Sequence, residues 1–237
     1  MRGWQKLTIG LVVLSGLLVG ADRIAVGVAE DQAADQLVKS GKLSARPEVS
    51  IEGFPFLTQV LSMKLDDVHL SADELTVGDG RQQVALHSFK AELSGVEVSG
   101  SLDNATVSKG TGSGLITYAD LGRLLPPASQ FVPEAGKLIP GNTRLSLSYG
   151  GPGKIKAALG PMQVGEGTVR VKDNTVTTDG FQLTGLASMI GGATGQHIQP
   201  VGFSLGALPA GLKLADAVPQ PDGLKLTFQG TGLKLVG

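Results

Sequence analysis

The sequence contains no cysteine and few aromatic residues. Its 237 residues include 1 tryptophan, 2 tyrosines, 7 phenylalanines and 3 histidines. A chain without cysteine forms no disulfide and offers neither a thiol nucleophile nor a thiolate metal ligand. The histidines stand far apart, and none lies in a zinc-binding spacing such as H-E-x-x-H. The sequence therefore argues against a metalloenzyme, and we expect no metal ion or other cofactor.

Neither sign of charge is in excess. The 20 basic and 21 acidic residues leave a formal net charge of -1. Proteins that bind nucleic acids present basic surfaces, with aromatic side chains where bases stack. We therefore expect no nucleic acid among the partners. The 35 glycines and 12 prolines fall between apolar segments, as turn residues do, and a chain that is 41% hydrophobic can bury a core.

One long hydrophobic run stands near the N-terminus. Arg2 and Lys6 precede an uncharged run at residues 7–21, which ends at Asp22 and Arg23. As a helix this run is about 22 Å long, which is shorter than a hydrocarbon core of ~30 Å. It predicts either a signal peptide at residues 1–21 or an uncleaved signal-anchor. Either way we expect an exported protein, in a periplasm-like space or at the outer face of the cytoplasmic membrane.

The segment at residues 21–42 has the period of a helix. Its larger apolar side chains fall on one stripe, with small alanines between them and the charged side chains elsewhere. The sequence therefore predicts an amphipathic helix. The stripe that we expect to face the interior consists of Ile24, Val28, Leu37 and Val38.

From Glu48 onward the alternation has period two, and it predicts about ten strands separated by turns. With one N-terminal helix, this pattern indicates an α+β fold on a large antiparallel sheet, as a single domain over residues 22–237. Many strands carry Ala, Ser, Thr or Gly on one face, which reflects either an unfilled cavity or a compositional bias. The glycine-rich run at residues 110–114 lacks the features of a nucleotide-binding loop, and we interpret it as a flexible turn.

One short motif belongs to a class of hydrolases. Residues 202–206 match G-x-S-x-G, with Ser204 at the centre and His197 upstream. That motif requires a helix directly after the serine and a histidine later in the chain. Here Pro209 and Gly211 follow the serine, and His197 precedes it. We therefore assign no catalytic residue and keep Ser204 only as the candidate nucleophile of an alternative, enzymatic function.

The segment Gly53-Phe54-Pro55-Phe56-Leu57 holds two phenylalanines and a proline, whereas the rest of the chain is poor in aromatic residues. The glycine permits backbone angles that other residues avoid, and the proline keeps the preceding residue extended. We therefore expect a sharp turn that holds both rings at defined angles. Two interpretations remain open. Either both rings pack on the N-terminal helix, or Phe54, Phe56 and Leu57 line the mouth of a cavity or enter a bilayer.

Several segments resemble the LmeA-like family of actinobacterial envelope proteins. They are the apolar run that ends in Ala21-Asp22-Arg23, PEVSIEGFPFLTQ at residues 47–59, DVHL at 67–70, LPAGL at 208–212 and DGL at 222–224. The resemblance runs from about Ala21 to the C-terminus, and GFPFLTQ is its most specific part. The family usually has a glycine about where Met63 stands, and this chain departs from it there.

Members of that family are regarded as phospholipid-binding and resemble the tubular lipid-binding (TULIP) superfamily. In that fold a strongly curved, mainly antiparallel sheet wraps around a long helix and encloses an apolar tunnel for acyl chains. The resemblance therefore implies a phospholipid or another acyl lipid as ligand and a membrane surface as partner. We expect the lipid-binding cavity mouth at Phe54, Pro55, Phe56, Leu57, Val60 and Leu61.

The expected function is therefore that of an exported cell-envelope protein that binds, and carries, phospholipid. Burial of an acyl chain stabilises the complex by ~0.8 kcal/mol per methylene group, which requires no specific polar contact. The first alternative is a phospholipase or esterase that acts on envelope lipids, because a lipase-type activity has been entertained for the family. The second is a structural envelope protein with a filled core and no ligand.

Overall fold

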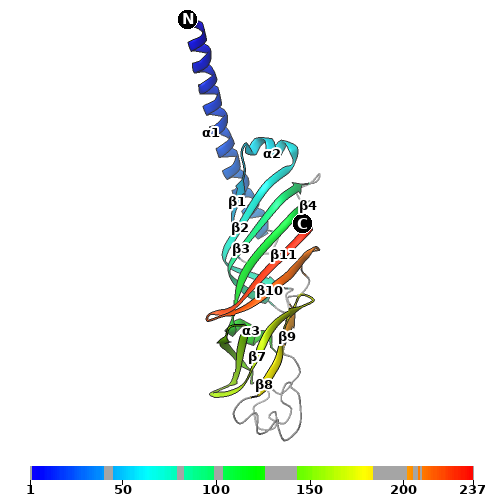
Figure 1. Ribbon diagram of the computed structural model, residues 1–237. Helices are drawn as coiled ribbons and strands as arrows, with labels where there is room; N and C mark the ends of the chain where they lie inside the picture. Colours follow the sequence, from blue (N-terminus) through cyan, green and yellow to red (C-terminus); the bar gives the residue numbers. More distant parts are fainter. Residues whose placement is uncertain are drawn as a thin grey trace.

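The residues that the structure describes form a long N-terminal helix, two short helices and two antiparallel β-sheets (Figure 1). The computed structural model describes residues 2–39, 45–78, 83–98, 104–125, 143–183, 202–204, 208 and 210–236. Helix α1 is Arg2–Lys39, α2 is Phe56–Ser62 and α3 is Tyr118–Leu124. The apolar run and the predicted amphipathic helix thus form one continuous helix.

The first sheet has six strands in the order β1-β2-β3-β4-β11-β10. Each strand pairs with its neighbour in antiparallel register. Their bounds are β1 Glu48–Glu52, β2 Lys64–Gly78, β3 Gln83–Val98, β4 Asn104–Thr117, β10 Leu212–Gln220 and β11 Gly223–Val236. Long alternating segments favour such strands, because one face can pack on a core while the other meets water.

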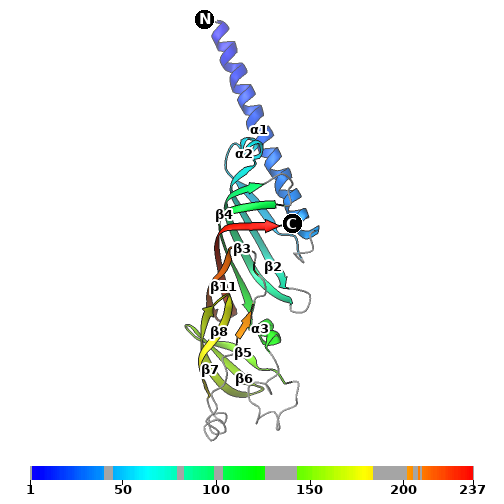
Figure 2. The ribbon, with the colours of Figure 1, turned by 90° about the vertical axis from the view of Figure 1, so that its right-hand side faces the viewer.

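The second sheet has five strands in the order β5-β6-β7-β8-β9, again antiparallel. Their bounds are β5 Ser146–Gly151, β6 Lys154–Leu159, β7 Met162–Lys172, β8 Thr175–Leu183 and β9 Gly202–Ser204. Helix α3 follows β4 directly and leads away from the first sheet. The next described strand, β5, then pairs with β6, which starts a separate sheet at the far end of the molecule from α1 (Figures 1 and 2).

The α+β class with antiparallel sheets is confirmed, but the arrangement differs from the one expected. The described residues form two sheets, and among them we see neither a strongly curled sheet around the helix nor a tunnel. Only the C-terminal half of α1 packs on the body, against β1 and α2, whereas its N-terminal half extends away (Figure 2). The helix therefore lies beside the first sheet and not inside it.

Two clusters of buried side chains make up most of the core. The helix cluster lies where α1 meets the first sheet and consists of Val26, Ala34, Val49, Ile51, Phe56, Val68, Val96, Val107 and Leu233. The junction cluster joins the two sheets and α3, with Leu75, Leu86, Ile116, Leu121, Leu224 and Leu226 from one side and Ile155 and Val176 from the other. The two sheets therefore share one hydrophobic core.

Candidate functional site

A row of glycines lies on the inner face of the first sheet. Gly110, Gly112 and Gly114 alternate along β4, so all three face the same side. The interpretation of residues 110–114 as a flexible turn is therefore wrong, because they lie in the interior of β4. All five pair with β11, and residues 110–113 also pair with β3. The signal that was present in the sequence is the spacing G-x-G-x-G, which has the period of a strand.

The three glycines differ in what lies over them. A Cβ atom at Gly110 would meet Leu233 Cδ1 at 2.6 Å, and one at Gly114 would meet Leu86 Cδ2 at 3.1 Å. These two leucines belong to the helix cluster and the junction cluster, respectively. The absence of side chains at Gly110 and Gly114 thus lets each cluster reach down to the backbone of β4.

Gly112 lies between the two clusters and has no such cover. The three atoms nearest to a Cβ atom there would be Lys90 O, Ala91 Cβ and Phe228 Cβ, at 3.5 to 3.9 Å. Ala91 and Phe228 are its direct partners on the two neighbouring strands, so these contacts are lateral. Gly112 is also more exposed than Gly110 or Gly114, which are buried. The inner face of the first sheet is therefore uncovered at Gly112.

Apolar side chains surround this uncovered position. Leu70 pairs with Ala91 on the next strand, and Phe89 and Leu93 flank Ala91 along β3. All four are half-buried: Leu70 and Leu93 pack against the helix cluster, and Phe89 packs against the junction cluster. We call this surface the glycine shelf and define it by Leu70, Phe89, Ala91, Leu93 and Gly112. It is an apolar surface that can accept the side of an acyl chain.

A separate apolar pocket lies between α3 and the second sheet. Its walls include Leu121, Leu125, Ile155, Val176 and Phe203. The space inside amounts to about 20 Å³, which is room for about one water molecule. This pocket is therefore too small for an acyl chain.

The residues expected at a cavity mouth separate into two groups. Phe56 is buried in the helix cluster, so one of the two rings packs on α1. Phe54, Leu57, Val60 and Leu61 are exposed together with Pro55, at the end of the molecule from which α1 extends (Figure 1). Leu61 is the most exposed of them, at 85%. The structure thus places one ring in the core and the other at the surface.

Polar contacts from α1 hold the turn and α2 in place. The buried Asp22 carboxylate accepts a hydrogen bond from the backbone N–H of Leu57 at 2.9 Å and one from Arg23 at 2.6 Å. The guanidinium of Arg23 lies over the Phe54 ring, 5.5 Å from its centroid. The sequence pattern around Asp22 and Arg23 did not predict these contacts, because Leu57 lies 35 residues further along the chain.

The expected interior stripe of α1 is only partly directed at the sheet. Ile24 and Val28 are exposed, whereas Leu37 packs on the helix cluster and Val38 is half-buried. The residues of α1 that are buried against the body are Asp22, Val26 and Ala34. The face of α1 that packs on the helix cluster is formed mainly by the small residues Ala25, Ala29 and Ala33 beside Val26 and Ala34. The larger Ile24 and Val28 lie outside this face.

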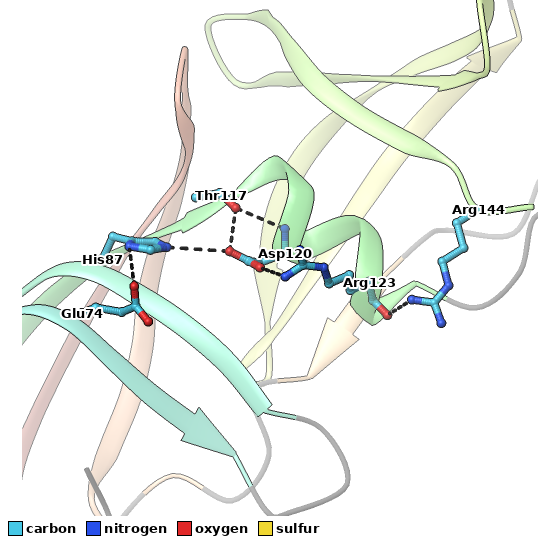
Figure 3. A network of polar contacts seen from close by, with 6 residues as sticks. All are labelled: Glu74, His87, Thr117, Asp120, Arg123 and Arg144. Carbon is cyan, nitrogen blue, oxygen red and sulfur yellow. Dashed lines mark hydrogen bonds and ion pairs between the residues drawn. The ribbon is translucent and has the colours of Figure 1, made fainter. Parts of the chain in front are cut away.

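A polar network lies at the start of α3, beside the junction cluster (Figure 3). Thr117 caps the helix by accepting the N–H of Asp120 at 3.1 Å, and its hydroxyl donates to the Asp120 carboxylate at 2.6 Å. Asp120 also lies 2.6 Å from Arg123 and 3.7 Å from His87, which is 3.6 Å from Glu74. The network links β2, β3 and α3, because each of these elements contributes a charged group.

Of Ser204 and His197, the structure places only the backbone of Ser204. Ser204 is the last residue of β9, where it pairs with Thr175 at the edge of the second sheet. His197 lies outside the described residues. Within the described ranges, no group of three or more His, Asp or Glu side chains is placed to hold a metal ion.

Comparison with known proteins identifies the family. A family profile described as LmeA-like phospholipid-binding matches residues 20–229. No curated protein and no solved structure matches the chain. The profile covers both sheets, the glycine shelf and the turn at Gly53, and it begins just before Asp22. The chain therefore belongs to the LmeA-like phospholipid-binding family, and this membership implies that it binds phospholipid.

Proposed function

We propose that this protein is exported and holds the acyl chains of a phospholipid against the glycine shelf of the first sheet. The observation that carries the proposal is the uncovered position of Gly112 between two filled clusters. An acyl chain laid on the shelf would continue the apolar surface from the helix cluster to the junction cluster. Sheet β1–β4 with β11 and β10 would then be one wall of the tunnel expected for the family.

The energetics require no polar recognition of the chain. Each methylene group that leaves water stabilises the complex by ~0.8 kcal/mol. Small residues on the shelf let the chain approach the backbone closely, as Gly112 and Ala91 do here. Burial alone can therefore hold the lipid.

The long N-terminal helix supports a location at a membrane. The helical segment Leu11–Lys39 is long and apolar enough, by length and composition, to cross a bilayer, although a signal sequence has the same properties. In the proposal, the run at residues 7–21 directs export as a signal peptide or holds the protein as an anchor. Residues 22–237, whose two sheets share the junction cluster, form the lipid-binding domain.

The test is to purify the full chain from its host and extract it for lipid analysis by mass spectrometry. We expect a stoichiometric amount of phospholipid. It should stay bound when the protein is exchanged into a detergent that does not resemble a phospholipid. A protein free of lipid after gentle extraction, and unable to take up added phospholipid, would contradict the proposal and favour a structural protein without a ligand. Release of fatty acid from added phospholipid that is lost in Ser204→Ala would instead show a hydrolase.

A further inference from the structure

One end of the molecule presents apolar side chains to solvent. They come from the turn before α2, from α2 itself and from the residue after it. We call this surface the tip and define it by Phe54, Leu57, Val60, Leu61 and Met63, all of which are exposed. A cluster of large apolar side chains at one end of a domain is typical of a surface that meets a membrane or a partner.

The helix that carries the tip exposes Leu57, Val60 and Leu61, although it buries Phe56 and a polar residue, Gln59. Gln59 is 7% exposed, whereas Leu61, two positions later, is 85% exposed. The buried Gln59 side chain donates to Glu52 O at 3.2 Å and accepts the N–H of Asp66 at 2.8 Å. A helix on a water-exposed surface has the opposite pattern, with polar side chains outward. The exposed side chains of Leu57, Val60 and Leu61 are therefore suited to an apolar environment.

Met63, the residue that ends α2, also exposes an apolar side chain. Met63 adopts a left-handed conformation with φ of 53° and caps α2 through its N–H, which donates to Val60 O at 3.0 Å. Glycine is favoured in this conformation, because a Cβ atom is crowded there. The chain instead places an exposed, apolar methionine at this position. The side chain is thus kept at a conformational cost.

The tip adjoins the exposed apolar part of α1. The Asp22 carboxylate binds the N-terminus of α2, and the exposed apolar side chains of α1 at residues 11–19 end at Val19, three residues before Asp22. The large side chains of this run are exposed, and they include Leu11, Leu14, Leu17, Leu18 and Val19. Figure 1 shows α2 lying across the direction of α1 at the level where α1 leaves the body. The two apolar surfaces are therefore continuous.

We propose that the tip is a membrane-docking surface that inserts its side chains into the interface of the bilayer. The lipid surface is the partner that fits, because the tip continues the run of α1 whose length and composition suit a membrane. A helix lying across α1 would lie in the plane of such a bilayer, with its apolar face in the acyl region. Arg23, stacked on Phe54, would stand at the level of the lipid phosphates.

This inference is independent of the glycine shelf, since it concerns how the protein sits on the membrane and not which lipid it carries. It can be tested by fluorescence, because the chain has no cysteine and accepts a single label. The full chain is reconstituted into vesicles of phosphatidylcholine and phosphatidylglycerol that contain a lipid with a nitroxide on its acyl chain. An environment-sensitive probe is attached to Leu61→Cys, to Val19→Cys and to Lys225→Cys on the polar face of β11.

We expect the probe at Leu61→Cys to be quenched to an extent comparable with Val19→Cys and several times more than Lys225→Cys. A companion variant, Leu57→Ser with Leu61→Cys, should lose most of that quenching while its circular dichroism stays unchanged. Quenching at Val19→Cys with none at Leu61→Cys would overturn the inference, as would the absence of quenching at both. A blue-shifted but unquenched probe at Leu61→Cys would indicate a protein partner and would overturn it as well.

Discussion

The carboxylate of Asp22 in α1 accepts a hydrogen bond from the backbone N–H of Leu57, the second residue of α2, at 2.9 Å. A helix usually receives this cap from the residue that precedes it. In α2 that residue is Pro55, which makes no side-chain cap. Asp22 supplies the cap from another helix, and it thereby fixes the tip to the point at which α1 leaves the body.

Replacement of Asp22 by alanine should release α2 from α1. The N–H of Leu57 would lose its acceptor, and Arg23 would lose the carboxylate 2.6 Å away. We expect faster hydrogen exchange at the Leu57 amide in Asp22→Ala, with little change in the first sheet. Asp22→Asn should be intermediate, because an amide oxygen can also accept the bond. Equal exchange rates in the wild type and Asp22→Ala would show that this cap is not needed.

Replacement of Gln59 by leucine should destabilise the fold. The change leaves Glu52 O and the N–H of Asp66 without their partner in a buried place, which costs about 1–3 kcal/mol in the free energy of unfolding. The matched control is Leu61→Gln on the same helix, and this exposed change should stay within about 0.5 kcal/mol of the wild type. Urea unfolding in a mild detergent measures both. A larger loss in Leu61→Gln than in Gln59→Leu would contradict the inverted orientation of α2.

Replacement of Met63 by glycine should stabilise the end of α2. Relief of the left-handed conformation at φ 53° is expected to raise the free energy of unfolding by about 1 kcal/mol. Met63→Ala keeps a Cβ atom and should bring no such gain. Both variants should bind vesicles more weakly if the methionine side chain enters the bilayer. Unfolding and vesicle sedimentation therefore separate the two effects, and a gain in Met63→Ala equal to that in Met63→Gly would refute the conformational argument.

Tyr118 makes the stability of the protein sensitive to alkaline pH. Its hydroxyl donates to Gln220 O at 2.8 Å. Burial raises the pKa of Tyr118 from 10.0 to about 12, with smaller contributions from Tyr149 and Asp222. A pKa that is raised by folding contributes stability that is fully present below pH 10 and is lost as the pH rises toward 12.

We therefore expect the free energy of unfolding of the wild type to fall more steeply between pH 10 and 12 than that of Tyr118→Phe. At neutral pH the same variant should be less stable by about 0.5–1.5 kcal/mol, because it lacks the hydrogen bond. Tyr149→Phe serves as the control and should keep most of the alkaline loss. Parallel curves for the wild type and Tyr118→Phe would argue against the buried hydroxyl as the cause.

The parts of the fold that depend on local patterns were predictable from the sequence. Alternation of apolar and polar residues predicted the strands, and the long apolar run with its amphipathic continuation predicted α1. Helix α2 was not foreseen as a helix, because Leu57, Val60 and Leu61 face outward while Gln59 is buried beside Phe56. The pattern of a helix in water is therefore absent there.

The parts of the site that depend on distant contacts were not predictable. Asp22 and Leu57 are 35 residues apart, and no local pattern reports such a cap. The uncovered Gly112 depends on Leu233 and Leu86, which cover its neighbours from opposite ends of the core. The G-x-G-x-G spacing could have placed these glycines on one face of a strand, but not which of them lacks a cover. The second sheet was not predictable either. It exists because the chain leaves the first sheet at α3 and β5 then pairs with β6.

The central claim is that phospholipid lies on the glycine shelf, and Gly112→Leu tests it most directly. A Cβ atom at Gly112 has only ordinary contacts, at 3.5 to 3.9 Å, so a leucine there should fill the shelf without straining the strand. The matched control is Ser113→Leu, on the next residue of β4 and the opposite face of the sheet.

The measurement is the amount of phospholipid that co-purifies with each full-length variant, determined by mass spectrometry per mole of folded protein. We predict that Gly112→Leu loses most of its lipid and keeps the unfolding midpoint of the wild type, whereas Ser113→Leu retains wild-type lipid. Wild-type lipid in a folded Gly112→Leu variant would contradict the account, because it would show that the ligand lies elsewhere in the protein.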